Sequence, residues 1–286
     1  MKIAILSYYN DHISRGVETW AKELQKHSKK FADVNIISGA TVYLFWKLID
    51  SKIIVSTGGR FEIFFTRIWT WVLGKQLVVF SHSGPGADDK WNLLCFPNIF
   101  IAFSRSQAAW ANKFKLPWTR IDVIPHAVDT KMFCPDQKVK KKIDVLCVAA
   151  NNPDKRVELV SLAAGRLNLR IVGSGQLDEV PFAQMPVVYN QARVFSFVPQ
   201  PWEAFGLVFL EAMACNLPVV TIDDPTRREI VGDAGIFVKN PENTSELAKA
   251  MELALKIDWK DKPRRQAAKF SWNKIALLYE KLFNTF

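Results

Sequence analysis

The sequence predicts an α/β protein in which two Rossmann-like domains, each built on a parallel sheet, face a cleft. Two observations support this fold class. Short, nearly uninterrupted apolar runs alternate with longer amphipathic segments, and the alternation stops at one polar, basic stretch and then restarts. Such apolar runs are typical of parallel strands that helices cover on both faces. The length of 286 residues suits two domains of ordinary size.

The first domain is predicted over residues 1–128. Its expected strands lie at 2–8, 34–38, 51–57, 76–82, 98–104 and 121–126. Its expected helices lie at 16–30, 62–73 and 105–114. In the first of these helices Trp20, Ala21 and Leu24 recur at helical spacing, which is typical of a helix that packs against a sheet.

The stretch that interrupts the alternation is "DTKMFCPDQKVKKK", residues 129–142, and its lysines and single proline indicate an interdomain linker. The second domain is predicted over residues 143–270, and a last helix is expected over 271–284. The strands expected in the second domain lie at 143–150, 169–175, 192–199, 217–223 and 234–239. The helices expected there lie at 155–167, from about 205 to 214, and at 243–256.

Composition and local patterns argue against a membrane-spanning helix, a signal peptide, disulfide bonds and a metal site. The aromatic segment "FEIFFTRIWTWVLGKQLVVF" is interrupted by Glu62, Arg67 and Lys75, so no transmembrane helix is expected. The apolar run in "MKIAILSYYN" is too short for a signal peptide. The four cysteines show neither disulfide nor metal-binding spacing, and no aspartate cluster reads as a metal site. We therefore expect a cytoplasmic, metal-independent protein with free thiols.

The net charge of +10 fits an anionic partner such as a nucleotide or an anionic lipid. The alternative is a basic surface that only meets solvent. No nucleic acid is expected, because the sequence has no zinc finger, RNA-binding signature or long run of arginine and lysine. A nicotinamide-dependent oxidoreductase is disfavoured, because no G-x-G-x-x-G follows a strand and opens a helix.

The stretch "PQPWEAFGLVFLEAMACNLPVV", residues 199–220, is strongly apolar and carries no charged residue other than Glu203 and Glu211. Its two prolines predict a loop at the carboxyl end of a strand, and the helix that follows is apolar all round and therefore buried. A buried carboxylate needs a partner or a ligand, and the free N–H groups at a helix start favour phosphate. The plain alternative is that Glu203 caps the helix and Glu211 forms a salt bridge.

Five segments, taken together and in order, resemble the retaining GT-B glycosyltransferases of glycosyltransferase family 4, also called glycosyl transferases group 1. They are "IDVIPHAVDTKMFCP" (121–135), "LRIVGSG" (169–175), the E-x7-E segment "PWEAFGLVFLEAMACNLPVV" (201–220), "TRREIVGDAGIFVKNPENTSELAKAM" (226–251) and "KFSWNKIALLYEKLF" (269–283). The resemblance implies a GT-B fold in which the C-terminal helix, 271–286, packs back on the first domain. It also implies that the second domain binds a nucleotide-sugar and that the first binds the acceptor.

For the donor site, the resemblance implies that Glu211 binds the nucleotide ribose and that Glu203 contacts the transferred sugar. Further donor-binding residues implied by the match are Phe205, Gly206, Leu207, Lys155, Gly16 and Arg15. Lys155 matches the lysine of the family's G-R-x-x-x-x-K pattern, but Ala150 stands where that pattern has arginine. Arg156 or Arg15 is a candidate to supply the missing charge. A solvated lysine at a helix start is the plain alternative for Lys155.

In the first domain, Gly16 belongs to a loop where the family commonly has two glycines. His82 follows a strand, where the family often has a histidine near the transferred sugar, and it is assigned a catalytic role beside Glu203. A purely structural histidine is the alternative. Arg60 and Arg105 also follow strands and are expected to bind an anionic acceptor.

The implied function is a retaining, metal-independent hexosyltransferase without a cofactor. It would move a sugar from a UDP-, GDP- or ADP-sugar to a hydroxyl of a glycan or lipid-linked saccharide. The alternative, which Ala150 motivates, is a catalytically weak relative that binds a sugar nucleotide or glycan, or that supports a partner enzyme. Peripheral contact with the cytoplasmic face of a membrane is expected through Phe64, Phe65, Arg67, Trp69 and Trp71, unless residues 62–73 form a buried helix face.

Overall fold

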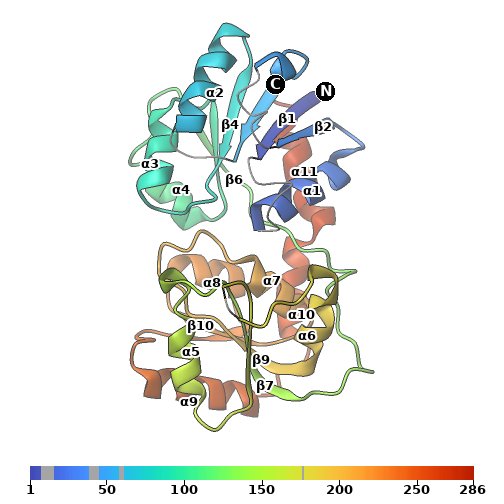
Figure 1. Ribbon diagram of the computed structural model, residues 1–286, viewed down its shortest axis with the longest axis vertical. Coiled ribbons are helices and arrows are strands. Elements are labelled where there is room, and N and C mark those ends of the chain that lie inside the picture. The colour runs from blue at the N-terminus through green and yellow to red at the C-terminus, as the bar shows by residue number, and fades with distance from the viewer. Residues whose placement is uncertain (8–15, 39–44, 58–60, 176) are drawn as a thin grey trace. The chain divides into compact units, whose positions relative to one another are not determined.

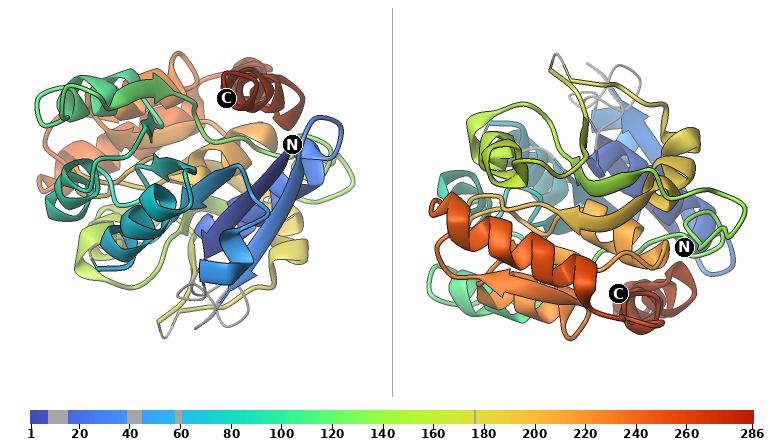
Figure 2. Two further views of the ribbon diagram at one scale, coloured as in Figure 1. Left: turned by 90° about the horizontal axis from the view of Figure 1, so that it is seen from above. Right: turned by 90° about the horizontal axis from the view of Figure 1, so that it is seen from below.

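The computed structural model describes residues 1–7, 16–38, 45–57, 61–175 and 177–286 (Figures 1 and 2). The chain divides into two compact units. The first unit comprises Met1–His126 together with Trp272–Phe286, and the second comprises Ala127–Ser271.

The first unit is built on a six-stranded parallel sheet in the order β2-β1-β3-β4-β5-β6. Its strands are β1 (Lys2–Ser7), β2 (Asp33–Ser38), β3 (Ile53–Ser56), β4 (Gln76–Phe80), β5 (Ile99–Ala102) and β6 (Arg120–Val123). Strands β3 and β5 are wholly buried and β4 is buried except at Gln76, as their apolar sequences predict. The strand order reverses between β1 and β3, and the loops that follow these two strands fall mainly in ranges 8–15 and 58–60, outside the described residues.

The helices of the first unit are α1 (Gly16–Ser28), α2 (Phe61–Val72), α3 (Ala87–Leu94), α4 (Arg105–Ala111) and α11 (Trp272–Phe283), with a short 3-10 helix at Phe45–Leu48. The C-terminal helix α11 packs against α1 (Figures 1 and 2). There Trp20 Nε1 donates a buried hydrogen bond to Tyr279 Oη at 2.9 Å, and His27 stacks on Trp272. A helix that is distant in sequence therefore completes this unit.

The second unit is built on a five-stranded parallel sheet in the order β11-β10-β9-β7-β8. Its strands are β7 (Ile143–Val148), β8 (Leu169–Val172), β9 (Ala192–Ser196), β10 (Val219–Ile222) and β11 (Gly235–Val238). β7 pairs with β8 on one side and with β9 on the other, so the strand order reverses between β7 and β9. In open parallel sheets such a switch point leaves a crevice at the carboxyl ends of the strands, where ligands bind.

The α-helices of the second unit are α5 (Val157–Ala164), α6 (Met185–Gln191), α7 (Leu207–Ala214), α8 (Pro225–Val231), α9 (Thr244–Lys256) and α10 (Lys262–Ala267), with short 3-10 helices at Pro153–Lys155, Phe182–Gln184 and Ala268–Phe270. α5 packs against α9 beside the sheet (Figure 1). The two parallel sheets with their helices confirm the predicted α/β fold class.

Four helices, namely α3, α6, α8 and α10, were not predicted from the sequence. Three of them carry a proline at their first or second position. Proline fits the first turn of a helix, where its missing N–H would have no partner, but without a structure it is easily read as a loop signal. The fourth, α3, is only eight residues long and begins with an acidic turn.

Residues 129–142, predicted as a linker, belong to the second unit. Their backbone contacts that unit: Asp136 N–H donates to Asn190 Oδ1 at 2.8 Å, and Lys142 N–H donates to Gln191 O at 2.8 Å. The polar composition of the segment reflects its exposed lysines rather than freedom from the domain.

Candidate functional site

The switch point of the second sheet brings two predicted site residues together. The loop after β7 leads to Lys155, and the loop after β9 leads to Glu203 (strands in Figure 1). Lys155 Nζ donates to Glu203 Oε2 in an ion pair between residues 48 positions apart. The two side chains are 29% and 15% exposed, so the pair still reaches solvent. The groups assigned to the donor diphosphate and to the donor sugar are thus paired with each other.

Helix α7 begins directly after this loop, at Leu207, and Gly206 precedes it. Gly206 has φ of 84°, and a Cβ there would lie 2.6 Å from the ring of Phe209. Only glycine fits this conformation and this space. The residue at the N-cap position is Gly206, so the alternative in which Glu203 is the capping residue is wrong. Gly206 has no side chain to offer the first turn, and its carbonyl oxygen accepts the Phe209 N–H at 3.0 Å.

Glu211 lies one turn further along α7, whose other residues are mostly buried. Tyr189 of α6 donates its hydroxyl to Glu211 Oε2 at 2.7 Å. Burial raises the pKa of Glu211 to about 7, although the Tyr189 hydrogen bond opposes this shift. Among the ion pairs of the described ranges none involves Glu211, so the alternative of a salt bridge is wrong. One carboxylate oxygen is anchored, and the group retains capacity to accept hydrogen bonds from a ligand.

Arg156, a candidate for the missing basic charge, follows Lys155 with a left-handed backbone, φ of 49°. Its Nε donates to Val198 O at 3.0 Å, and Nη1 lies 3.2 Å from Glu242 Oε1. Burial lowers the pKa of Arg156, and Glu242 opposes that shift. The guanidinium therefore already holds the loop after β9. Arg15, the other candidate for this charge, lies outside the described residues.

The reasoning from sequence missed Arg227, which also holds this loop. Arg227 is fully buried on α8, and its Nη1 donates to Glu203 O at 2.8 Å. Its Nε donates to Asp224 Oδ2 at 2.8 Å. The only signal in the sequence is an arginine three residues after an aspartate that precedes proline, which is compatible with a cap and says nothing about Glu203.

His82, the residue of the first unit that was assigned a catalytic role, lies in a buried aromatic setting. His82 follows β4 and packs among aromatic rings, with ring centroids 4.9 Å from Trp20 and 5.0 Å from Phe103. Burial lowers the pKa of His82 to about 3, so its imidazole is neutral at physiological pH. Its Nε2 is buried and has no hydrogen-bond partner among the residues that the structure describes. A neutral ring of this kind can accept or donate one hydrogen bond but cannot act as a strong acid.

The loop that carries His82 is fixed by a buried carboxyl group. Ser81 donates its hydroxyl to Asp89 Oδ2 at 2.5 Å, and Asn92 Nδ2 donates to Asp89 Oδ1 at 3.1 Å. Burial raises the pKa of Asp89 to about 7, and the hydrogen bonds from Ser81 and Asn92 oppose that shift. Asp89 was not predicted, because the adjacent aspartates Asp88 and Asp89 were considered only as a metal site.

The remaining predicted residues of the first unit do not form a site among the described residues. Gly16 is the first residue of α1, and Arg105 is the exposed first residue of α4. Arg60 lies outside the described ranges.

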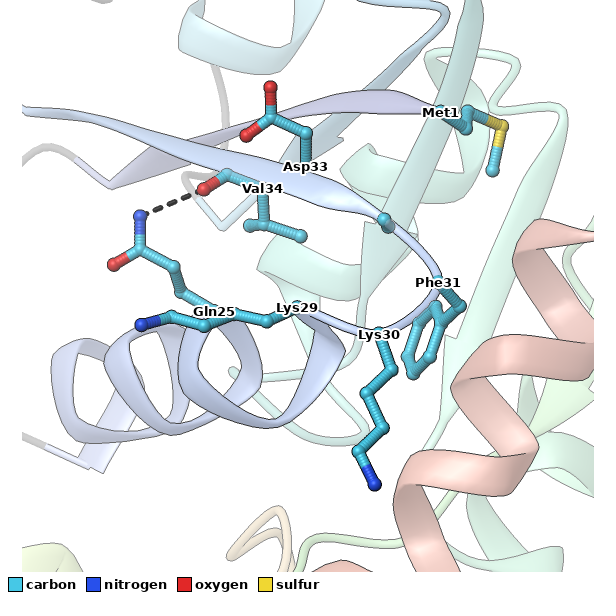
Figure 3. Close-up of a pocket in the computed structure, with 8 residues that line it drawn as sticks. Met1, Gln25, Lys29, Lys30, Phe31, Asp33 and Val34 are labelled. Atoms are coloured by element: carbon cyan, nitrogen blue, oxygen red, sulfur yellow. Dashed lines mark hydrogen bonds between the residues drawn. The ribbon is translucent and has the colours of Figure 1, made fainter.

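An open pocket of about 630 Å³ lies where α1 leads into β2 (Figure 3). Met1, Gln25 and Lys30 are among the residues that line it, and Gln25 Nε2 donates to Val34 O at 2.8 Å. None of the predicted site residues lines this pocket. It therefore contributes nothing to the site described above.

Comparison with known proteins gives this geometry a context. Residues 176–271, which include Glu203, Glu211 and Arg227, match the family described as Glycosyl transferases group 1. Solved structures of Anabaena Alr3699/HepE, in complexes with UDP and glucose or with UDP-glucose, superpose on the whole chain with TM-scores of 0.80 and 0.83, at 16% and 15% sequence identity. The chain therefore has the GT-B fold.

The curated relatives of this chain include mannosyltransferases by name. The O-antigen chain mannosyltransferase B of Escherichia coli is 37% identical over 101 residues, which cover 34% of this chain and 26% of the relative. The lipopolysaccharide core biosynthesis mannosyltransferase LpsB of Rhizobium meliloti is 28% identical over 240 residues, covering 68% of this chain and 65% of the relative. The matches thus span between about a quarter and about two thirds of these relatives.

Proposed function

We propose that this chain is a retaining, metal-independent glycosyltransferase of family 4. It moves a hexosyl group from a nucleotide-diphosphate sugar to a hydroxyl of a glycan or lipid-linked saccharide. The observation that carries the proposal is the Lys155–Glu203 ion pair at the switch point of the second sheet, directly before the start of α7, whose N-cap is Gly206. A cation, a carboxylate and the N–H groups of a helix start in one place are what a diphosphate joined to a sugar requires.

In this proposal each residue has one task. Lys155 leaves Glu203 and neutralises the diphosphate together with the first N–H groups of α7. Glu203 stabilises the positive charge that develops on the sugar, and Glu211 accepts hydrogen bonds from the ribose. The departing diphosphate takes the proton of the acceptor hydroxyl, so no protein base is required. His82, neutral in its buried setting, orients the transferred sugar by a hydrogen bond rather than by proton transfer.

The relatives suggest which donors to test first. Three of the matched relatives are named mannosyltransferases, and the HepE structures contain UDP, glucose or UDP-glucose. Mannosyl and glucosyl donors are therefore the leading candidates, with the UDP, GDP and ADP conjugates as the panel. Ala150 keeps the alternative of a catalytically weak, sugar-nucleotide-binding relative open.

The first test is a thermal-shift screen of UDP, GDP, ADP and their sugar conjugates. One nucleotide is expected to stabilise the protein, by about 2.7 kcal/mol at roughly 100 times its Kd. The shift should largely disappear in Glu211→Ala. Slow hydrolysis of the same sugar nucleotide without acceptor would separate the enzyme from the inactive relative. If no nucleotide stabilises the protein, the catalytic proposal fails, and the alternative of a relative that supports a partner enzyme replaces it.

Peripheral membrane contact is also part of the proposal, through one face of α2. Phe64, Phe65, Ile68, Trp71 and Val72 recur at helical spacing and are all exposed. The alternative, that residues 62–73 form a buried helix face, therefore holds for one side of α2, which includes the buried Ile63 and Thr70, but not for these five side chains. No helix among the described residues is long and apolar enough to cross a bilayer. Exposed aromatic and aliphatic side chains on a chain of charge +10 fit the surface of an anionic membrane.

Two residues predicted for this contact do not belong to the exposed face. Arg67 is buried, and its Nη1 donates to Asn98 Oδ1 at 2.9 Å, while Trp71 covers its guanidinium. Trp69 is half-buried and packs against the core cluster that includes Leu6. Arg67 thus lies beneath Trp71, four residues away on the same side of the helix, and Trp69 points toward the sheet.

Co-sedimentation with vesicles of anionic phospholipid tests this contact. The double variant Phe65→Ser/Trp71→Ser is expected to lower vesicle affinity by at least about tenfold, because each large apolar side chain contributes about 1.5–3 kcal/mol when buried. The control is Leu162→Ser, which removes an exposed apolar side chain from the second unit. Equal binding by wild type and the double variant would contradict membrane contact through α2.

A further inference from the structure

The loop between β9 and α7 is held through its own backbone by a buried arginine on each of two helical segments. From α8, Arg227 donates Nη1 to Glu203 O at 2.8 Å and Nη2 to Pro201 O at 3.2 Å. At the start of α5, Arg156 donates Nε to Val198 O at 3.0 Å. The loop therefore presents its carbonyl oxygens to two cations while it presents the Glu203 carboxylate to Lys155.

Arg227 is the more completely enclosed of the two. Its side chain is 0% exposed, and Asp224 supplies the counter-charge through Oδ2 at 2.8 Å from Nε. Asp224 Oδ1 also accepts the Arg227 backbone N–H at 2.9 Å, which fixes both ends of the arginine. A buried charge needs a partner of this kind, and the planar guanidinium directs its remaining donors along fixed lines. These remaining donors are directed at the carbonyl oxygens of Glu203 and Pro201 in the loop.

We propose that Arg227 is a positioning residue for Glu203. By fixing the carbonyl groups of Pro201 and Glu203, it holds the Glu203 carboxylate at the start of α7 before the donor arrives. The inference rests on the proposed function, because it assigns Arg227 an effect on transfer that acts through Glu203. It assigns no contact between Arg227 and the substrates.

The geometry predicts which chemical property of Arg227 matters. Lysine would keep the charge opposite Asp224 but has a single nitrogen and cannot reach Asp224, Pro201 and Glu203 together. Without the several N–H donors of the guanidinium, the loop and the Glu203 carboxylate would be held less firmly. A displacement of about 1 Å can lower a reaction rate on the order of 10²-fold. Donor binding through Glu211 should change little, because Glu211 lies on α7 and is anchored by Tyr189 instead.

The test compares Arg227→Lys with Arg228→Lys, a matched change at the neighbouring arginine, which is exposed and pairs with Asp223. For Arg227→Lys we expect kcat to fall on the order of 10²-fold, while the Kd for the sugar nucleotide changes less than about threefold. Arg228→Lys should leave both values unchanged. In a Glu203→Gln background, Arg227→Lys should add little further loss, because the residue that it positions is already disabled.

Three results would overturn the proposal: a kcat for Arg227→Lys close to that of wild type, an equally large loss in the Glu203→Gln background, or a parallel loss of nucleotide affinity. If Arg227→Lys fails to fold, Asp224→Asn replaces it. This milder variant keeps both contacts of Arg227 with the loop but loosens the guanidinium, so a smaller fall in kcat with the same dependence on Glu203 is expected.

Hydrogen exchange separates this proposal from the proposed function. The N–H of Gln200 donates to Asp154 O at 2.9 Å, and that of Glu203 donates to Gln200 O at 3.0 Å, so both should be protected in the free protein. Faster exchange over residues 198–206 in Arg227→Lys, but not in Arg228→Lys, supports the positioning role without any donor. If wild type binds no sugar nucleotide, the proposed function fails, and unchanged exchange would overturn the positioning role as well.

Discussion

Glu203→Gln is expected to lower kcat by about 10²–10³-fold while the Kd of the donor stays the same or decreases. The first effect follows from the loss of a fixed negative charge beside the sugar, where positive charge develops in the transition state. The second follows from the ion pair: in the free protein Glu203 holds Lys155, so the donor diphosphate must draw the lysine away from it. A neutral amide releases Lys155 for the diphosphate. Steady-state kinetics and calorimetric titration with the donor identified by the thermal-shift screen measure the two quantities.

A fall in kcat without a rise in the donor Kd distinguishes this assignment from the simpler idea that Glu203 only binds the donor. In that case Glu203→Gln would weaken donor binding and leave kcat nearly intact. Glu252→Gln is the matched control, because Glu252 is an exposed glutamate of α9. Lys155→Met should raise the donor Kd in either case, since it removes the cation that the diphosphate requires.

The sequence predicts the arrangement of this site better than its internal contacts. Lys155 and Glu203 follow β7 and β9, and the rule that ligands bind beyond the carboxyl ends of parallel strands assigns both to a site. That their side chains pair in the free protein could not be predicted, because it depends on the distance between two loops that are 48 residues apart. Gly206 was correctly placed next to the helix start, but its steric need arises from Phe209, whose ring direction no local pattern gives.

Arg227 shows more clearly why the rest of the site was missed. Sequence patterns report periodicity and caps, and Arg227 fits the cap of α8 formed by Asp224. Its effect on Glu203 is a hydrogen bond from a side chain to the backbone carbonyl of another loop. Every residue offers such a carbonyl, so the identity of the acceptor residue carries no signal. Tyr189 was missed for a related reason, since an aromatic residue on a short helix reads as core until the direction of its hydroxyl is known.

Donor binding is expected to strengthen about tenfold between pH 6 and pH 8, because Glu211 titrates in this range. Burial raises the pKa of Glu211 from its ordinary value to about 7. Ribose hydroxyls donate to a carboxylate, so the ionised form binds, and its fraction rises from about 0.1 to about 0.9 over this interval. A sugar nucleotide is the right probe, because its diphosphate is a diester that does not itself titrate near neutrality.

The raised pKa of Glu211 predicts the opposite trend for the folding stability of the free protein, which falls as the pH rises. The folded state holds a proton on Glu211 at pH values where the unfolded chain has released it, so this group stabilises the fold below its ordinary pKa. Its contribution is lost as the pH rises toward 7. The groups that face Glu211 do not titrate in this window: burial raises the pKa of Cys215 to about 12 and that of Tyr189 well above its usual value. The donor thus binds most tightly at the pH values at which the ionised Glu211 carboxylate destabilises the free protein.

Glu211→Gln tests this account of both trends. The amide keeps an acceptor for Tyr189 but carries no charge, so donor affinity at pH 8 should fall about 10–10²-fold, the loss expected for hydrogen bonds to a charged group. The dependence of affinity on pH should disappear with it. Asp89 also has a pKa raised to about 7, in the first unit, so Asp89→Asn is the necessary control and should leave the donor-binding profile unchanged. If the pH dependence of donor affinity persists in Glu211→Gln and vanishes in Asp89→Asn, the titrating group is Asp89. The proposed binding of the ribose by Glu211 would then be wrong.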